Sequence, residues 1–201
     1  MTPLRTLLFA PVNHPRKVAK VFGAVNIGSF RISAMVAGLS ETGEMVVLGS
    51  GHRAAQGIKR GYITDMAAAT YAIRDAVEIP LIVDIDTGFG NALNVRQTIR
   101  ALERAGADAV QIEDQTFPKR CGHFAGKDVA PVEEMLSKIK AAVDARQDAN
   151  FQIIARTDAR AKYGLEAAIE RAQKFSEAGA DILFVEATES LEEVRSLTRL
   201  L

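Results

Sequence analysis

The sequence has almost no cysteine, no tryptophan and no net charge. Its 201 residues include one cysteine, Cys121, which excludes an intrachain disulfide framework and leaves either a buried filler residue or a reactive thiol. The 25 basic and 25 acidic residues cancel, so there is no electrostatic reason to expect a nucleic-acid partner. No apolar run approaches a membrane span, and the apolar stretch near the start is too short for a secretory signal. These absences leave a cytoplasmic enzyme or binding protein as the expected class.

Apolar residues make up 48% of the chain, which is enough for one substantial core. Their spacing alternates between helical and extended periods. It predicts helices over residues 15–22, 30–39, 64–77, 91–104, 131–145, 164–177 and 191–201. It predicts strands over residues 23–28, 45–49, 81–84, 108–113, 151–154 and 182–185. Thr64 is the expected N-cap of its helix, and Gly106 is an expected helix stop.

One phrase occurs twice in nearly the same form, as Ala-Gly-Ala-Asp-Ala-Val at 105–110 and as Ala-Gly-Ala-Asp-Ile-Leu at 178–183. Each copy marks a helix end followed by a buried parallel strand, which is typical of repeated β/α units. We therefore expect an α/β fold of the TIM-type (β/α)8 barrel, truncated to about six β/α units. It would form a single incomplete domain over 1–201 with a short N-terminal helix at 15–22. A partner that supplies the missing strands and a doubly wound sheet are the alternatives.

Four apolar runs end in charged side chains, namely Asp84 with Asp86, Glu113, Arg156 and Glu186. Charged residues rarely lie in such runs unless they are paired or bind a metal. Because the carboxyl ends of parallel strands meet at one edge, these side chains are predicted to form a ring at one end of the fold. A structural ion pair is the alternative for Arg156 and for Glu186.

Asp84 and Asp86 lie two residues apart, on the same side of an extended strand. Two such carboxylates repel each other, and a divalent cation relieves the repulsion. Ligands that are all oxygen suit Mg²⁺ or Mn²⁺ better than Zn²⁺. Asp-X-Asp also occurs by chance, but Glu113 at the next strand end brings a third carboxylate to the same place.

The segment Lys-Arg-Cys-Gly-His at 119–123 is a second candidate for chemistry. Two cations and His123 beside Cys121 favour the thiolate, which makes this thiol a candidate acid or base. A basic surface loop with an incidental cysteine is the alternative. The adjacent glycine, the lack of an apolar period and the position just after Glu113 favour a mobile catalytic loop.

Two long segments carry a family resemblance: VDIDTGFGNALNVRQTIRALERAGADAVQIEDQTFPKRCGHFAGKDV and FQIIARTDARAKYGLEAAIERAQKFSEAGADILFVEA. They resemble the isocitrate lyase and phosphoenolpyruvate mutase superfamily, and within it 2-methylisocitrate lyase and related carboxylate lyases. The resemblance is strong from about Leu81 to Ala187 and weaker upstream. The K-[KR]-C-G-H loop is its most specific element, because the phosphonate-processing branch differs there.

The resemblance implies roles at the metal. Asp84 and Asp86 would hold Mg²⁺ directly or through water, and Glu113 would be a further, water-mediated ligand. Cys121 would exchange a proton with the substrate. The remaining implied residues would contact substrate oxygens or line the inner polar shell, and they are Ser50, Gly51, Gly122, His123, Arg156 and Glu186.

The activity that the resemblance implies is Mg²⁺-dependent cleavage of a carbon–carbon bond in a 2-methylisocitrate-like or substituted malate substrate. The products would be a 2-keto acid and a dicarboxylate. An oxaloacetate-type decarboxylase or hydrolase and a phosphonomutase of the same superfamily are alternatives. An inactive truncated paralogue that acts as an assembly subunit is another. The implied partners are a small carboxylic acid and further copies of the chain in a homotetramer, with no nucleic acid and no membrane.

Overall fold

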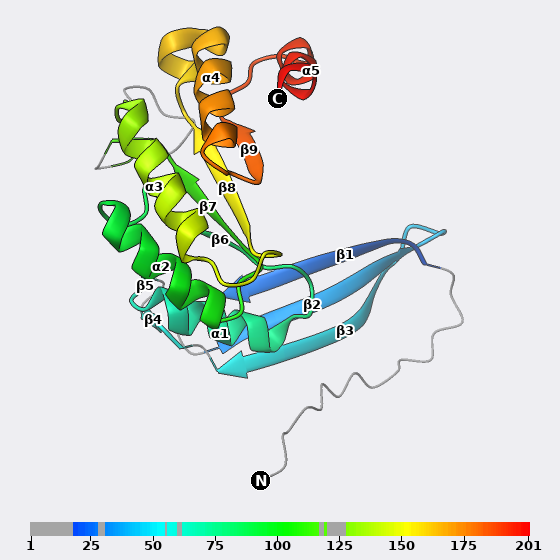
Figure 1. The fold of residues 1–201 in the computed structure, drawn as a ribbon. Coiled ribbons are helices and arrows are strands. Elements are labelled where there is room, and N and C mark those ends of the chain that lie inside the picture. The colour runs from blue at the N-terminus through cyan, green and yellow to red at the C-terminus, as the bar shows by residue number, and fades with distance from the viewer. Residues whose placement is uncertain (1–17, 28–30, 55, 60–61, 117–118, 120–127) are drawn as a thin grey trace. The chain divides into compact units, whose positions relative to one another are not determined.

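The computed structural model describes residues 18–27, 31–54, 56–59, 62–116, 119 and 128–201. These residues divide into two compact units, Met1–Ile79 and Pro80–Leu201, and each is described by itself (Figure 1). The prediction of one barrel domain over 1–201 therefore stays a prediction. Among the described residues, none of the helices combines the length and the apolar character that a membrane crossing requires.

The first unit is built around an antiparallel sheet. Its three strands pair in the order β1-β2-β3, and a two-stranded ladder and one helix complete the unit. The elements are β1 (Val18–Ile27), β2 (Arg31–Ser40), β3 (Met45–Ala54), β4 (Ile58–Lys59), β5 (Tyr62–Ile63) and α1 (Met66–Ala76). The described part of the strand predicted at 23–28 lies in β1, and the strand predicted at 45–49 lies in β3, but neither belongs to a parallel sheet.

A tight turn joins β2 to β3. Gly43 adopts a φ of +82°, and its N–H donates to the Ser40 carbonyl over 3.0 Å. The Ser40 hydroxyl accepts from the Glu44 N–H at 3.0 Å, so the side chain closes the same turn. A glycine at positive φ is the residue that such a turn requires.

Two helices predicted in this unit are wrong. Residues 18–22 of the predicted 15–22 helix lie in β1, and 15–17 lie outside the described residues. The described part of the predicted helix at 30–39 lies in β2. The apolar spacing of these segments fits a helix, but pairing along the whole of β2 with both neighbours overrides that local pattern. Helix α1 is capped by Asp65, not Thr64, since the Asp65 carboxylate accepts from the Ala68 N–H at 2.9 Å.

The second unit is a parallel α/β structure, as predicted. Its four-stranded sheet has the order β6-β7-β8-β9, and a helix follows each strand. The elements are β6 (Ile82–Asp84), α2 (Ala92–Arg104), β7 (Ala109–Glu113), α3 (Val132–Ala145), β8 (Gln152–Thr157), α4 (Arg160–Glu177), β9 (Ile182–Val185) and α5 (Leu191–Leu200). Helix α4 begins earlier than predicted, and Gly164 interrupts it with a φ of +86°.

The two faces of this sheet differ. Helices α2, α3 and α4 lie along one face (Figure 1), where the buried strand residues include Val110, Ile112, Ile153, Ala155 and Val185. On the opposite face, Glu113 pairs in register with Arg156, and Arg156 pairs with Phe184. The charged residues at the strand ends therefore lie on the face away from the helical core.

The repeated Ala-Gly-Ala-Asp phrase has a structural reason. Asp108 accepts from the Leu81 N–H at 2.6 Å, and Asp181 accepts from the Ile153 N–H at 2.8 Å. Each aspartate also donates its own backbone N–H to the carbonyl of the same residue, over 2.9 Å. Both copies thus fasten the start of one strand to the strand before it in the chain.

Candidate active site

Backbone hydrogen bonds bring the carboxyl ends of the four strands together. The Glu113 N–H donates to the Asp86 carbonyl over 2.8 Å, which ties β7 to the turn after β6. The Asp114 N–H donates to the Arg156 carbonyl at 3.2 Å, and the Glu186 N–H donates to the Thr157 carbonyl at 3.0 Å. The charged strand ends therefore lie in a row along this edge of an open sheet, and their closure into a ring stays a prediction.

The turn after β6 is fixed by its own side chains. Strand β6 ends at Asp84, and Asp86 lies in the turn with a φ of +49°, so the prediction that both carboxylates lie on one side of an extended strand is wrong. Asp84 Oδ1 accepts from the Asp86 N–H at 2.9 Å. Gly88 follows with a φ of +88°, and a Cβ there would lie 2.4 Å from Val95 Cγ2 and 3.0 Å from Ile112 Cδ1. Only glycine allows the turn to pack this closely on α2 and β7.

Glu113 is the most unusual carboxylate of the site. It is 1% exposed, and neither of its side-chain oxygens has a hydrogen-bond partner among the described residues. Burial raises the pKa of Glu113 to about 7, although the nearby Arg156 and Lys119 charges oppose this rise. An unsatisfied buried carboxylate in a polar row indicates a place for a proton, a water or a cation.

The ammonium group of Lys119 lies beside the carboxylates of Asp86 and Glu113. Lys119 Nζ is 2.6 Å from Asp86 Oδ1 and 3.9 Å from Glu113 Oε1. The hydrogen bond to Asp86 raises the pKa of Lys119. No group of three or more histidine, cysteine, aspartate or glutamate side chains is arranged to hold a metal ion within the part of the chain that the structure describes.

Arg156 connects the carboxylates of three strands. Its Nε and Nη2 donate to the two carboxylate oxygens of Asp158, each at 3.0 Å, while Nη1 lies 3.5 Å from Glu186 Oε2. The guanidinium also lies 5.6 Å from the centre of the Phe184 ring. Burial lowers the pKa of Arg156, but Asp158, Glu113 and Glu186 outweigh that effect and leave the pKa raised.

Asp114 forms a buried network behind this row. Its carboxylate accepts from Thr157 Oγ1 at 2.7 Å, from the Asp158 N–H at 2.9 Å and from Arg171 Nε at 2.9 Å. Burial raises the pKa of Asp114, and these hydrogen bonds counteract part of the rise. Sequence reasoning missed Asp114, Thr157, Asp158 and Arg171. The available signals were that Asp114 directly follows a predicted strand and that Asp158 lies two residues after the predicted site residue Arg156.

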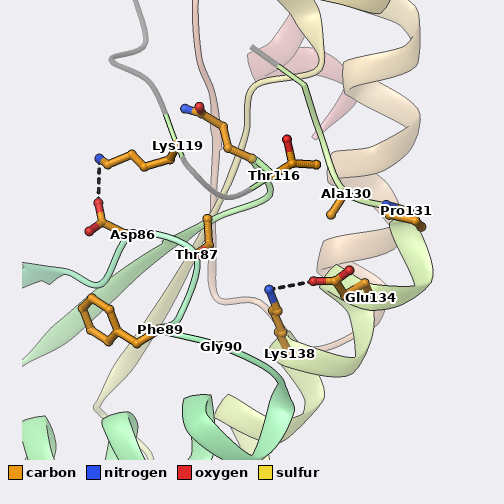
Figure 2. A pocket seen from close by; sticks show the side chains of 11 residues that line it. Asp86, Thr87, Phe89, Gly90, Thr116, Lys119, Ala130, Pro131, Glu134 and Lys138 are labelled. Carbon is orange, nitrogen blue, oxygen red and sulfur yellow. Dashed lines mark ion pairs between the residues drawn. The ribbon is translucent and has the colours of Figure 1, made fainter.

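A pocket of about 530 Å³ adjoins the Lys119–Asp86 pair (Figure 2). It lies between the turn after β6 and the start of α3, where Lys138 and Glu134 form a second ion pair at 2.9 Å. Phe89 and Pro131 supply apolar surface. In each of the two ion pairs the positive and the negative charge cancel. The pocket can therefore bind a mostly apolar group of a ligand next to the charged row.

The structure does not test the roles predicted for five further residues. Ser50 and Gly51 lie on β3, in the unit that is described by itself. Cys121, Gly122 and His123 lie outside the described residues. The structure therefore leaves their predicted roles untested, whereas it places Asp86, Glu113, Arg156 and Glu186 along one edge of the sheet.

The phosphoenolpyruvate phosphomutase family matches residues 17–201. The chain belongs to this family. A 2,3-dimethylmalate lyase of Eubacterium barkeri is 40% identical over 193 residues, which cover 96% of the chain and 63% of that relative. A 2-methylisocitrate lyase of Aeropyrum pernix is 56% identical over 137 residues, covering 68% of the chain and 44% of that relative. The chain thus spans about half to two thirds of the length of these curated relatives.

Solved members of the phosphoenolpyruvate phosphomutase superfamily share the fold. A phosphonopyruvate hydrolase in complex with oxalate and Mg²⁺ has a TM-score of 0.58 and 40% identity, over 66% of this chain and 46% of that one. The structural relatives are TIM-barrel enzymes, which confirms the predicted α/β fold class. The predicted membership of this superfamily is confirmed as well.

Proposed function

We propose that this chain carries the site of a Mg²⁺-dependent carbon–carbon lyase that acts on 2-methylisocitrate or a related substituted malate. The observation that carries the proposal is the row Glu113–Arg156–Glu186 at the strand ends, with Asp86 and Lys119 beside it. A carboxylic-acid substrate needs cations for its carboxylates and a polarising group for its hydroxyl. The lyases among the relatives support this choice of reaction.

The carboxylates of the site suit a divalent cation. Glu113 is buried without a hydrogen bond from a described residue, and Asp84 and Asp86 are two residues apart at the neighbouring strand end. Asp84 and Asp86 would hold Mg²⁺, or Mn²⁺, and Glu113 would bind it through water. When bound, the ion would polarise substrate oxygens and stabilise developing negative charge. In its absence Lys119 balances part of this charge.

The protein residues supply binding and proton transfer. Arg156 would bind a substrate carboxylate through Nη1, and Glu186 would hold this group in place. The carbon–carbon bond breaks, its electron pair stays on the departing carboxylate fragment, and the hydroxyl proton passes to a base of the site. The Cys121 thiol would then protonate the departing fragment. Gly122, His123, Ser50 and Gly51 are proposed to contact the remaining substrate oxygens.

A hydrolase or mutase acting on a keto acid is the second candidate. Its support is the 40% identity to the phosphonopyruvate hydrolase. The two candidates differ in the substrate that they cleave and in the second product. The lyase releases a 2-keto acid and a second carboxylic acid from a tertiary alcohol. Hydrolysis of oxaloacetate gives oxalate and acetate, hydrolysis of phosphonopyruvate gives phosphate and pyruvate, and a mutase converts phosphonopyruvate to phosphoenolpyruvate. The homotetramer and the cytoplasmic location also stay predictions. Light scattering tests the oligomeric state.

The deciding assay measures products from four substrates in the presence of Mg²⁺: 2-methylisocitrate, 2,3-dimethylmalate, oxaloacetate and phosphonopyruvate. We expect pyruvate from the first or second, with succinate or propionate as the second product, and no release in EDTA. Cys121→Ala and Arg156→Lys should each lower turnover about 100-fold or more. Arg146→Lys, at the other end of β8, should retain activity.

Failure has distinct meanings in this assay. Oxalate from oxaloacetate, or phosphate with pyruvate from phosphonopyruvate, without cleavage of the two substituted malates, supports the hydrolase. Phosphoenolpyruvate formed from phosphonopyruvate supports the mutase. No product from any substrate overturns the enzyme proposal and favours the assembly subunit. Unchanged turnover in Cys121→Ala removes the thiol from the mechanism.

A further inference from the structure

We propose that Asp158 is a positioning residue that fixes the Arg156 guanidinium so that its Nη1 end faces the substrate site. The inference rests on the proposed function, in which Arg156 binds a substrate carboxylate. It concerns a residue that does not itself contact the substrate.

The contact between the two side chains is geometrically specific. Asp158 Oδ2 accepts from Arg156 Nε and Oδ1 accepts from Nη2, each at 3.0 Å. The Asp158 side chain is fully buried, and that of Arg156 is 12% exposed. A paired fork of this kind fixes the plane of the guanidinium as well as its position.

The fork leaves one end of Arg156 for a ligand. A guanidinium has five N–H donors, and the Asp158 contact uses one on Nε and one on Nη2. Among the described residues, Nη1 makes no hydrogen bond, and its nearest carboxylate is Glu186 at 3.5 Å. The Phe184 ring lies at one side of the same group. The donors that remain are therefore those on Nη1 and the second on Nη2.

Asp158 also competes with another carboxylate for Arg156. Nε lies 3.0 Å from Asp158 Oδ2 but 3.5 Å from Glu113 Oε2. Without the Asp158 charge, the guanidinium would turn toward Glu113, because that carboxylate is buried and has no hydrogen bond from a described residue. Such a pair would remove both groups from the substrate at once.

The position of Asp158 is itself fixed from the neighbouring strand. Its backbone N–H donates to Asp114 Oδ1 at 2.9 Å, and the Thr157 hydroxyl donates to Asp114 Oδ2 at 2.7 Å. Arg171 donates to the same Oδ2 at 2.9 Å and, through Nη2, to the Ala130 carbonyl at 2.8 Å. The chain of contacts thus runs from α4 and β7 through Asp158 to Arg156.

The test is Asp158→Asn, which keeps the shape of the side chain but removes its charge. We expect kcat/KM to fall about 10- to 100-fold, as for other residues that orient a functional group. The matched control is Asp181→Asn, because Asp181 also binds an arginine, Arg146, and a backbone N–H, but at the other end of β8. It should keep kcat/KM within about twofold of the unmodified chain.

A second readout is independent of turnover. The Arg156 Nε–H signal in nitrogen-15 NMR, assigned by its loss in Arg156→Lys, should be protected from exchange in the unmodified chain and in Asp181→Asn. In Asp158→Asn it should exchange about tenfold faster or more. If the chain releases no pyruvate from 2-methylisocitrate or 2,3-dimethylmalate, the proposed function fails, and this signal alone decides the positioning role.

Folding is checked by thermal unfolding of each variant. Should Asp158→Asn fail to fold, Thr157→Val takes its place. It removes one hydrogen bond to Asp114 and the acceptor of the Ala159 N–H, and it should change kcat/KM and the Arg156 signal in the same direction. In a folded Asp158→Asn, or in its absence a folded Thr157→Val, an unchanged Arg156 signal overturns the inference. Where the unmodified chain is active, unchanged turnover overturns it as well.

Discussion

The ammonium nitrogen of Lys119 lies 2.6 Å from Oδ1 of Asp86, at the strand end where a divalent cation is proposed. The same nitrogen is 3.9 Å from Glu113. One residue of the predicted catalytic loop thus supplies a positive charge to carboxylates from two strands. A metal ion and this lysine would compete for the same oxygens.

Lys119→Met should therefore strengthen Mg²⁺ binding. Removing a positive charge next to the carboxylates lowers the electrostatic cost of bringing in the ion, and we expect an affinity about tenfold higher by calorimetric titration. Lys162→Met is the control, because Lys162 pairs with Asp128 instead. Equal or weaker Mg²⁺ binding in Lys119→Met would show that the two cations do not share a site.

Glu113 should make stability depend on pH. Its folded pKa of about 7 lies above the ordinary value of 4.5, so the folded state binds the extra proton between these two values. Its contribution to stability is complete below about pH 4.5 and is lost as the pH rises through 7. Over that window the free energy of unfolding should fall by at most about 3 kcal/mol relative to Glu113→Gln.

Urea unfolding of both proteins from pH 4 to 8, without metal, measures this difference. Glu113→Gln is the reference because it removes the titration and keeps the shape. If the free energy of unfolding of the unmodified protein, relative to that of Glu113→Gln, stays constant or rises with pH, the raised pKa is contradicted.

Gly88→Ala and Gly164→Ala separate backbone strain from steric overlap. Both glycines have almost the same positive φ, +88° and +86°, but a Cβ at Gly164 meets nothing within 4 Å. We expect a loss of about 1 kcal/mol from backbone strain at either position. At Gly88 the overlap with Val95 and Ile112 should add about 1–3 kcal/mol. Equal losses in denaturant unfolding would contradict the close packing of the turn after β6.

Asp114→Ala should be among the most destabilising substitutions in the second unit. It leaves the Thr157 hydroxyl, the Asp158 N–H and one Arg171 donor without their acceptor in a buried place. The expected loss is about 3–5 kcal/mol. Asp144→Ala, at an exposed position of α3, should change stability by about 0.5 kcal/mol or less. A similar small loss in both would mean that the network contributes little.

The second unit was predictable because its local signals agree with its tertiary structure. Asn91 caps α2 with its side chain, Gly106 ends that helix at a positive φ, and buried apolar runs follow. In β2 the signals conflict. Its apolar spacing fits a helix, whereas its backbone pairs with the neighbouring strands β1 and β3, and a local apolar period does not reveal that pairing.

The candidate site divides in the same way. Glu113 and Arg156 were found because a charge at the end of an apolar run is conspicuous in a sequence. Asp114 was missed, since its meaning comes from Arg171, 57 residues further along the chain. Lys119 was noticed only as a neighbour of Cys121, and its contact with Asp86 depends on how the loop folds back.

The fastening of strands by Asp108 and Asp181 acts at the amino ends of the strands, whereas every group of the candidate site lies at the carboxyl ends. The side chains that join the strands at their amino ends are therefore different from those of the candidate site. With the strands joined in this way, an acid, a base or a metal ligand at the carboxyl ends can be substituted without weakening the contacts that hold the strands together. One fold can in this way carry a lyase, a hydrolase or a mutase site, because a change of substrate does not require compensating changes that restore stability.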